Sequence, residues 1–491
     1  MNLTQRDQIL DLLMTIEEGL DYASKNTRDK AGVMLNDCNN GLFFLQNLLQ
    51  EHHAIHQCIQ EAIHILNSDI PSRKTNELFI SDIYRTKESI GTIKEIVVNK
   101  LDVELEVLFL PYKASMWDSL ESIYTEAQAD PNCKCYVVPI PYYEKNEHGE
   151  IIKFCYEGNE FPNDVAITPF ELYNLEERKP DIVYIHNPYD QYNKLTMVNP
   201  NYFSDVLAQY TKMLVYVPYY VAGSIESVAF QLLPSFKNVN KIITQSSALT
   251  NTYLISGVDS EKLLTLGSPK IDAMVTLHNR DSELTWYWEK MIENKKVILF
   301  NTGIADLLAT SMWLERIEEI VSHFLNLKDY VLIWRPHPLT EVTLNTMRPN
   351  IKKNFLALKD KINQSSNIII DKSSNVYTAV NISDALISDY SSIMLQYIVT
   401  GKPILSVVDE EMTREGRNYF SDYLGCYFTN EGVTVADFID ILEKDKDYKK
   451  ENRVNRFKRS ITNPDGNSGS IIYNKIKTEL INKHFTVSEK G

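Results

Sequence analysis

Two polar segments in the second half of the chain have the composition of a phosphate-binding site. Residues 335–338 (Arg-Pro-His-Pro) and 388–392 (Ser-Asp-Tyr-Ser-Ser) each follow a short apolar run. An arginine can bind a diphosphate through two parallel N–H groups, and a histidine can donate to an oxygen that gains charge as a bond breaks. Hydroxyls and free amides at a helix start also bind anions, although helix capping alone uses the same residue types. We therefore predict that His337 is catalytic. We also predict that Arg335, Asp389, Ser391 and Ser392 bind a donor substrate or its phosphate.

Weaker signals of the same kind follow two further apolar runs. Thr302 and Gly303 form a small polar turn, in which a glycine lets the backbone approach a ligand closely. Ser268 and Lys270 lie in a tight turn between the two halves of the chain, where they could contact a phosphate or belong to a hinge. We add all four residues to the predicted donor-binding set.

A candidate acid–base pair lies in the first half of the chain. His186 follows the apolar run 182–185, and Asp190 comes shortly after it. A carboxylate that orients an imidazole suits a general base acting on an acceptor hydroxyl, whereas a single histidine after a strand often has a structural role. We predict that His186 and Asp190 are catalytic. Tyr219 and Tyr220 follow another run and could stack on an acceptor or pack within their loop.

These residues need a scaffold that brings the ends of many strands together. After residue 100, short apolar runs alternate with amphipathic helical stretches. The runs lie at 105–110, 136–140, 182–185, 213–217, 241–244 and 263–266, and then at 297–300, 330–334, 368–370, 385–387, 404–408 and 426–428. Runs rich in Val and Ile without strict alternation are typical of parallel strands buried on both faces. We predict an α/β fold with two Rossmann-like domains facing each other and a ligand beyond the carboxyl ends of the strands.

The N-terminal region differs from the rest of the chain. Apolar residues recur there at helical spacing, with no proline before Pro71. We predict an α-helical extension at 1–100, an N-terminal Rossmann-like domain at 101–278, a C-terminal Rossmann-like domain at 279–460 and a helical segment at 461–491. The extension would pack on its own domain or join copies of the chain in a homo-oligomer.

The composition limits the classes of partner. The 491 residues include 50 Lys and Arg against 66 Asp and Glu, and this formal charge of −16 argues against nucleic-acid binding. The six cysteines form no CxxC pair, which favours a reducing compartment and predicts no metal centre of that type. No secretory signal or membrane-spanning run is visible, so we expect a cytoplasmic protein with at most peripheral membrane contact. The absence of G-x-G-x-x-G and P-loop motifs disfavours dinucleotide oxidoreductases and P-loop NTPases.

Five segments, taken in order, resemble the CDP-glycerol glycerophosphotransferase family, the teichoic acid primases and polymerases of Gram-positive bacteria. They are residues 267–272 (Gly-Ser-Pro-Lys-Ile-Asp), 296–302, 335–338, 387–392 and 401–404 (Gly-Lys-Pro-Ile). The resemblance covers roughly residues 205–480, including 465–470. It implies a GT-B fold and transfer of glycerol phosphate, or in relatives ribitol phosphate, from a CDP-linked donor, with no required metal or cofactor. It also implies that His337 stabilises the donor diphosphate and that Ser391 and Ser392 bind phosphate.

One departure from the family concerns the acceptor side. The family has a Trp-His-Gly-Thr-like motif whose histidine is taken as the base, but the matching place here, residues 217–223 (Val-Pro-Tyr-Tyr-Val-Ala-Gly), holds no histidine. Either His186 has taken its role, or the acceptor chemistry differs, or activity has been lost. Lys270 stands where arginine is common in the family, so it offers the point charge of an ammonium group in place of the two parallel N–H groups of a guanidinium.

The predicted function is transfer of a polyol-phosphate unit from a CDP-linked substrate to a polyol-phosphate or glycan acceptor in cell-surface polymer synthesis, at the inner face of the cell membrane. The acceptor hydroxyl would attack the β-phosphorus and release CMP. Two alternatives keep the same fold: a nucleotide-sugar glycosyltransferase for a surface glycan, and a non-catalytic GT-B-like scaffold protein.

Overall fold

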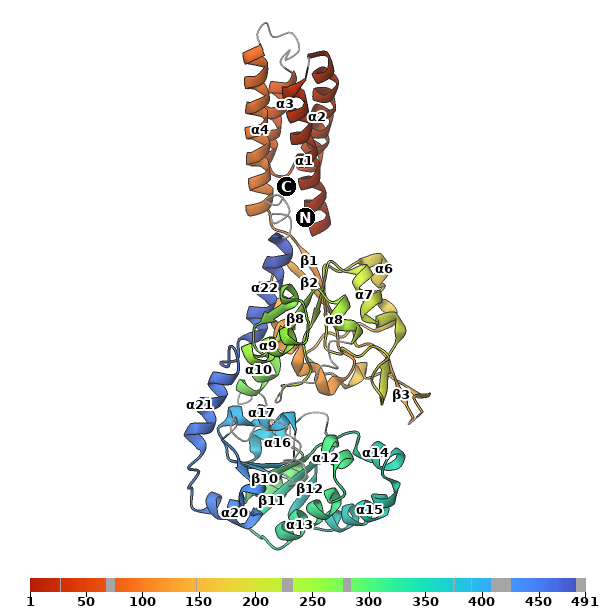
Figure 1. The fold of residues 1–491 in the computed structure, drawn as a ribbon, viewed down its shortest axis with the longest axis vertical. Coiled ribbons are helices and arrows are strands. Elements are labelled where there is room, and N and C mark those ends of the chain that lie inside the picture. The colour runs from red at the N-terminus through yellow and green to blue at the C-terminus, as the bar shows by residue number, and fades with distance from the viewer. Residues whose placement is uncertain are drawn as a thin grey trace. The chain divides into compact units, whose positions relative to one another are not determined.

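The computed structural model describes residues 1–26, 28–67, 76–146, 148–222, 233–276, 284–373, 376–389, 391–407 and 425–482. The chain forms two compact units, whose elements are labelled in Figure 1. The first unit contains Met1–Leu105, Pro131–Lys134 and the residues from Ile481 onward, and the second contains Glu106–Asp130 and Cys135–Leu480. No helix in the described part of the chain is long and apolar enough to cross a membrane.

The described helices of the first unit form a bundle. They are α1 (Leu3–Lys25), α2 (Arg28–Leu48), α3 (His53–Asn67) and α4 (Asn76–Asn99). Each helix packs against the next, and α4 packs back on α1, so the apolar stripe of each helix is buried in one core. The Asn2 side chain caps α1 by accepting a hydrogen bond from the Gln5 N–H (2.8 Å), and the Gln5 side chain accepts one from the Asn2 N–H (3.1 Å). The predicted α-helical N-terminal region is confirmed.

The second unit contains two six-stranded sheets, and the first of them defines the N-terminal α/β domain. Its strand order is β2-β1-β5-β7-β8-β9. The strands are β1 (Leu105–Leu110), β2 (Cys133–Val137), β5 (Ile182–Ile185), β7 (Met213–Tyr216), β8 (Lys241–Thr244) and β9 (Leu263–Thr265). The helices are α5 (Glu121–Ala129), α6 (Leu175–Arg178), α7 (Ser204–Tyr210), α8 (Pro234–Asn238), α9 (Ser247–Ile255) and α10 (Pro269–Val275). The pairings from β1 to β9 are parallel, as predicted.

One strand of this sheet is displaced from its predicted place. The run at 136–140 was expected to be a strand, but β2 ends at Val137. The N–H groups of Val138 and Ile140 donate to the carbonyls of Phe109 and Pro111, both at 2.9 Å, so the apolar run still lies along β1 after the regular strand has ended.

A smaller antiparallel sheet of order β4-β3-β6 is inserted in this domain, and the sequence analysis did not predict it. It consists of β3 (Tyr142–Lys145), β4 (Ile151–Cys155) and β6 (Thr196–Val198). Ile151, Ile152 and Phe154 on the edge strand β4 are all exposed. Because this strand has no buried face of alternating residues, hydrophobic periodicity could not reveal it.

The second sheet defines the C-terminal α/β domain and has the order β12-β11-β10-β13-β14-β15, with every pairing parallel. Its strands are β10 (Lys296–Thr302), β11 (Tyr330–Pro336), β12 (Ile368–Ile370), β13 (Ala385–Ser388), β14 (Ile404–Ser406) and β15 (Tyr427–Phe428). Its helices are α11 (Trp286–Ile292), α12 (Ile304–Ala309), α13 (Trp313–Leu325), α14 (Thr340–Thr346), α15 (Pro349–Asn363), α16 (Tyr377–Ile382), α17 (Ser392–Tyr397), α20 (Val435–Glu443) and α21 (Lys450–Ser460), and α22 (Ser468–Asn482) follows them in the chain. All the strands predicted in this half are confirmed.

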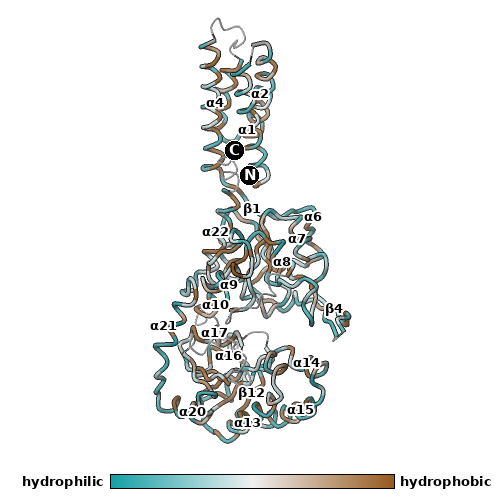
Figure 2. Tube along the Cα trace, viewed as in Figure 1, coloured by the Kyte–Doolittle hydropathy of each residue, from teal (hydrophilic) through white to brown (hydrophobic). Residues whose placement is uncertain are grey.

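Both faces of the second sheet are covered. Val297 and Leu299 on β10 belong to one apolar core, and Ile298 and Phe300 belong to the other, because successive side chains of a strand point to opposite faces. Helices α16 and α17 cover the first face, while α13 and α15 cover the second (Figure 1). Figure 2 shows apolar residues along the strands between these helices.

The C-terminal helix α22 returns to the N-terminal α/β domain. The Asp272 carboxylate accepts hydrogen bonds from the N–H groups of Ser468 (3.0 Å) and Gly469 (2.7 Å) at the start of α22. Gly267 has φ +97°, and a Cβ on it would lie 2.4 Å from Ser468 Oγ, so only glycine fits this turn. Residues 267–272 and 465–470, which the sequence analysis noted separately, therefore pack directly against each other.

Candidate active site

Three of the predicted segments meet at one edge of the second sheet. Strands β11, β10 and β13 are neighbours, and their register places Asn301 beside both Arg335 and Ser388. Neighbouring strands lie about 4.8 Å apart. His337, Gly303 and Asp389, each of which directly follows one of these strands, therefore lie close together at the carboxyl edge, as expected.

His337 presents one ring nitrogen as a hydrogen-bond donor. Its backbone N–H donates to the Thr302 carbonyl (2.9 Å), and its Nδ1 accepts from the Leu339 N–H (3.1 Å). Because Nδ1 is an acceptor, the ring proton lies on Nε2, which bonds to no residue of the described chain. Burial lowers the pKa of His337 to about 4, and the charges of Lys113 and Arg335 act in the same direction. The ring is thus neutral near pH 7 and offers an Nε2–H group.

Arg335 does not present its guanidinium to a ligand. Nη1 donates to the Asp371 carboxylate and to Ser373 Oγ (3.2 Å), and Nη2 donates to the Ser373 carbonyl (2.8 Å). The Arg335 side chain is only 9% exposed. The prediction that Arg335 binds a diphosphate is therefore wrong, because the Asp371 carboxylate and Ser373, in the loop after β12, already bind the N–H groups of its guanidinium.

Thr302, Gly303 and Asp389 hold the sheet edge together. The Gly303 N–H donates to both carboxylate oxygens of Asp389, at 2.7 and 2.6 Å. Burial raises the pKa of Asp389 well above its usual range, and the neighbouring Asp306 raises it further. Thr302 Oγ1 accepts from the indole N–H of Trp334 (3.2 Å). The Gly303 N–H and the Asp389 carboxylate are thus bonded to each other within the protein, while the Thr302 hydroxyl keeps its own hydrogen. Donor binding by these three residues stays a prediction.

Ser391 caps the helix α17. Its Oγ accepts a hydrogen bond from the Ile393 N–H (3.4 Å), and the side chain is partly exposed. A hydroxyl that accepts through a lone pair keeps its own hydrogen available for a ligand. The side chain of Ser392 and the residue Tyr390 lie outside the described part of the chain, so only the backbone start of α17 at Ser392 is placed.

Lys270 is buried in an ion pair. Its Nζ lies 2.6 and 2.7 Å from the two carboxylate oxygens of Asp118, which also accept a hydrogen bond from the Tyr377 hydroxyl of the C-terminal α/β domain. The side chains of Lys270 and Asp118 are 9% and 8% exposed. The prediction that Lys270 binds phosphate is therefore wrong, because its charge is neutralised where the two α/β domains meet.

His186 and Asp190 do not form the predicted pair. His186 is fully buried; its Nε2 accepts from the Tyr112 N–H (3.0 Å), and its Nδ1 lies 2.9 Å from Ser119 Oγ. Burial lowers the pKa of His186 to about 3, and Lys270 lowers it further. Asp190 instead accepts from Ser204 through its N–H (3.1 Å) and Oγ (2.7 Å). With both ring nitrogens used and the carboxylate elsewhere, the predicted base with its orienting carboxylate is contradicted.

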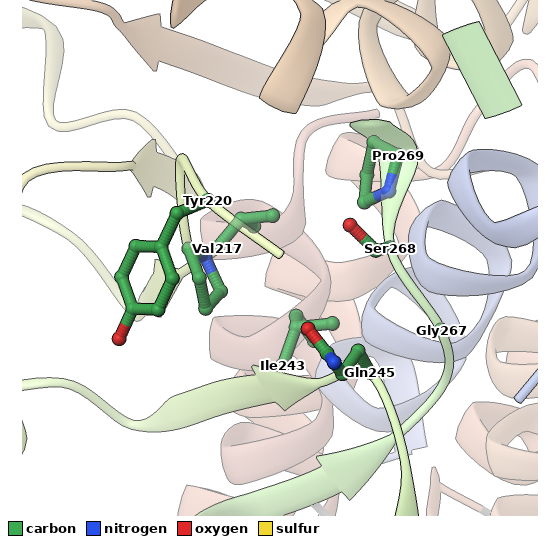
Figure 3. A pocket seen from close by; sticks show the side chains of 8 residues that line it. Val217, Tyr220, Ile243, Gln245, Gly267, Ser268 and Pro269 are labelled. Atoms are coloured by element: carbon green, nitrogen blue, oxygen red, sulfur yellow. The ribbon is translucent and has the colours of Figure 1, made fainter. Parts of the chain in front are cut away.

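A small hollow lies at the carboxyl ends of β7, β8 and β9, in the loop where the family's histidine was expected. It is lined by Val217, Pro218, Tyr220, Ile243, Gln245, Gly267, Ser268 and Pro269, and its volume of about 10 Å³ is room for about one water molecule. Figure 3 shows Tyr220 and Val217 on one side of it and Ser268 and Pro269 on the other. The Gln245 side chain holds the loop in place with two hydrogen bonds. Its Oε1 accepts from the Ala222 N–H (2.7 Å), and its Nε2 donates to the Ala222 carbonyl (2.5 Å). Ser268 thus lies beside the loop that follows β7.

The sequence analysis missed a charged cluster after β1. Lys113 Nζ donates to the Tyr142 hydroxyl (3.3 Å) and lies 4.0 Å from a Glu157 oxygen. The Tyr142 hydroxyl donates to Glu157 Oε1 (2.6 Å), and the Ala114 N–H donates to Oε2 (2.9 Å). Lys113 lies three residues after the end of the buried parallel strand β1, so the rule that ligand groups follow strand ends could have found it.

Among the described residues, the side chains that keep unused donors at these edges include His337, Ser391 and Lys113. An imidazole N–H, a hydroxyl and an ammonium all suit an anionic oxygen such as that of a phosphate. Within the described ranges, no group of three or more His, Cys, Asp or Glu side chains is arranged to hold a metal ion.

Comparison with known proteins gives two sequence matches. Residues 227–478, just over half of the chain, match the family described as CDP-glycerol:poly(glycerophosphate) glycerophosphotransferase. The chain is also 23% identical over 357 residues to the teichoic acid glycerol-phosphate primase of Bacillus subtilis (strain 168), in an alignment that covers 68% of this chain and 87% of the primase.

Solved structures give two further likenesses. A variant of the wall teichoic acid polymerase TagF, soaked with CDPG for 15 minutes, is similar with a TM-score of 0.51 at 15% identity, covering 87% of this chain and 98% of that one. A UDP-N-acetylglucosamine 2-epimerase gives a TM-score of 0.48 at 15% identity, covering 78% of this chain and 97% of that one. The likeness to TagF confirms the GT-B fold that the sequence resemblance implied.

Proposed function

Because the chain belongs to the CDP-glycerol:poly(glycerophosphate) glycerophosphotransferase family, we propose that it transfers a glycerol-phosphate, or a similar polyol-phosphate, from a CDP-linked donor to an acceptor hydroxyl. The acceptor is a polyol-phosphate or a glycan of a teichoic-acid-like polymer. The names of the similar primase and of the CDPG-soaked polymerase support a donor of this class. The observation in this chain that carries the proposal is the neutral His337 with its unused Nε2–H at the carboxyl edge of the second sheet.

The proposed reaction is a substitution at the β-phosphorus of the donor. The acceptor oxygen forms a new bond to this phosphorus, the bond from phosphorus to the bridging oxygen of the diphosphate breaks, and CMP leaves with that oxygen. Negative charge grows on the diphosphate oxygens, so the His337 Nε2–H stabilises the transition state by hydrogen bonding. Ser391, Ser392 and the backbone amides at the start of α17 bind the transferred phosphate. The acceptor hydroxyl gives up its proton to solvent, and we do not assign His186 as its base, because both ring nitrogens of His186 already lie in hydrogen bonds.

The test compares the full-length chain with His337→Ala, and uses His148→Ala in the exposed turn between β3 and β4 as the matched control. Binding of CDP-glycerol, CDP-ribitol, CMP and UDP-sugars is measured by calorimetry, and turnover by release of CMP. We expect CDP-linked donors to bind the wild type, and His337→Ala to lower turnover about 100- to 1,000-fold, as the loss of one transition-state donor does elsewhere. His148→Ala should behave as wild type.

Product analysis separates the rival functions. A new phosphodiester in the product, seen by ³¹P NMR, supports polyol-phosphate transfer, because only that reaction keeps the phosphate in the new linkage. Binding of UDP-sugars in preference to CDP donors, with a product that lacks phosphate, would replace the proposal with a glycosyltransferase. Failure of every nucleotide to bind would leave a non-catalytic scaffold.

A further inference from the structure

A donor diphosphate needs positive charge, and the two cations that the sequence analysis offered are already neutralised. Arg335 is bonded to Asp371, and Lys270 is bonded to Asp118. The imidazole of His337 is neutral near pH 7. Neutral donors such as the His337 Nε2–H and the Ser391 hydroxyl can orient a phosphate, but they do not balance its charge.

Lys113 is a cation held in place with donors to spare. Its ammonium group carries three N–H donors and makes one hydrogen bond to the described chain, the 3.3 Å bond to the neutral Tyr142 hydroxyl. Nζ also lies over the Tyr142 ring, 4.6 Å from its centroid, an arrangement in which a cation is attracted without being neutralised. The side chain is 18% exposed, so it is accessible but not free in solvent.

The neighbouring carboxylate attracts this charge without taking up the hydrogen bonds of the ammonium group. Glu157 lies 4.0 Å from Nζ, beyond hydrogen-bond distance. Its two oxygens already accept from the Tyr142 hydroxyl at 2.6 Å and from the Ala114 N–H at 2.9 Å. Glu157 therefore fixes the position of Tyr142 and of the backbone beside Lys113, and leaves the ammonium able to bond to another anion.

Lys113 and His337 face the same region from different domains. Lys113 follows the carboxyl end of β1 and His337 follows the carboxyl end of β11, the two places where ligands of such sheets bind. The short helix Ala114–Ser119, which begins directly after Lys113, reaches the C-terminal α/β domain, where Asp118 accepts a hydrogen bond from the Tyr377 hydroxyl. Burial is the main cause of the lowered pKa of His337, and the charge of Lys113 contributes to it. An anion bonded to the His337 Nε2–H is therefore within the field of the Lys113 ammonium.

We infer that Lys113 supplies, from the N-terminal α/β domain, the positive charge that binds the diphosphate of the donor opposite His337. This inference rests on the proposed function for the identity of the donor, but the diphosphate chemistry itself can be tested without it. Lys113 thus takes the role that Arg335 and Lys270 cannot fill, and it makes the donor site depend on both α/β domains.

The test measures binding of CDP-glycerol and of inorganic pyrophosphate to wild type, Lys113→Met, Lys113→Arg and Lys153→Met. Lys153 is the matched control. It lies on β4, which pairs with the strand β3 that holds Tyr142, it is 63% exposed, and it pairs with Glu144. Loss of one charge-assisted contact should weaken both ligands about 10- to 100-fold in Lys113→Met. Lys113→Arg should recover most of the affinity, and Lys153→Met should match the wild type.

A second readout needs no ligand. In ¹³C-histidine-labelled protein, the NMR titration of His337, assigned by its loss in His337→Ala, should show a higher pKa in Lys113→Met than in wild type, because one of the charges that lowers it is gone. Lys153→Met should leave the His337 pKa unchanged. A variant that unfolds would reveal itself by losing all the dispersed histidine signals. Lys113→Gln then replaces Lys113→Met as the decisive comparison with wild type, because glutamine also removes the charge.

The outcomes separate this inference from the proposed function. Equal binding of either diphosphate by wild type and Lys113→Met overturns the inference, whatever His337 does. Lys113-dependent binding of pyrophosphate without binding of CDP-glycerol upholds the inference and refutes the CDP-linked donor. If the wild type binds neither ligand, both fail.

Discussion

The buried pair of Lys270 and Asp118 makes a prediction that distinguishes a structural lysine from a ligand-binding one. Lys270→Met removes the ammonium but keeps the length of the side chain. It leaves the Asp118 carboxylate, 8% exposed, with the Tyr377 hydroxyl as its remaining donor within the described chain. Breaking a buried pair in this way costs about 3–5 kcal/mol. The unit that holds the pair has about 370 residues, so its unfolding entropy is about 0.8 kcal/mol/K and the melting temperature should fall by about 4–6 °C.

The assay is thermal unfolding followed by circular dichroism at pH 7, with CDP-glycerol affinity measured at 20 °C. The double variant Lys270→Met/Asp118→Asn should recover most of the lost stability, because an asparagine keeps an oxygen for Tyr377 without the unpaired charge. CDP-glycerol affinity should stay within about threefold of wild type in both variants. A melting temperature within about 1 °C of wild type, together with a lost affinity for CDP-glycerol, would refute this reasoning and return Lys270 to the donor site.

Three further substitutions test the assignments of the other corrected residues. Burial raises the pKa of Asp190 to about 6, so the native state holds this proton more tightly than the unfolded state does. Asp190 therefore lowers the stability of the fold as the pH rises from about 4 to 6. Asp190→Asn should melt at a higher temperature than wild type at pH 7, and this difference in melting temperature should disappear below pH 4. His186→Gln should lose about 1–3 kcal/mol of stability, measured by urea unfolding, while CMP release from CDP-glycerol changes less than threefold. Arg335→Lys should also lose about 1–3 kcal/mol, because lysine cannot bond to both Asp371 and Ser373, whereas a larger loss of donor affinity than of stability would contradict our assignment.

Much of the fold could be predicted from local sequence. The apolar runs of the second half became β10 to β15, because a strand with helices on both faces buries every side chain, as Val297 and Ile298 do on opposite faces of β10. The rule that ligand groups follow strand ends placed His337 and Ser391 correctly at one edge. The strand β4 escaped prediction because its side chains are exposed and show no period.

The roles of charged residues could not be predicted in the same way. Asp118 lies 152 positions before Lys270, and Asp371 lies 36 positions after Arg335. Nothing near Lys270 or Arg335 in the sequence indicates that a distant carboxylate will neutralise it. The sequence identified residues of the right type at strand ends, but the number of donors left for a ligand depends on which partners the fold brings to them.

What the sequence alone determined was therefore the class of protein: its α/β domains, its helical N-terminal region, and its family, which rests on segments such as 267–272 and 388–392. The tertiary structure decided which side chains keep a free donor. It used Arg335, Lys270 and His186 within the protein and left His337 and Lys113 with unused N–H groups. The physical reason is that strand and helix patterns arise from neighbours along the chain, whereas the charge and the hydrogen bonds available at a site are what remains after residues far apart in sequence have paired.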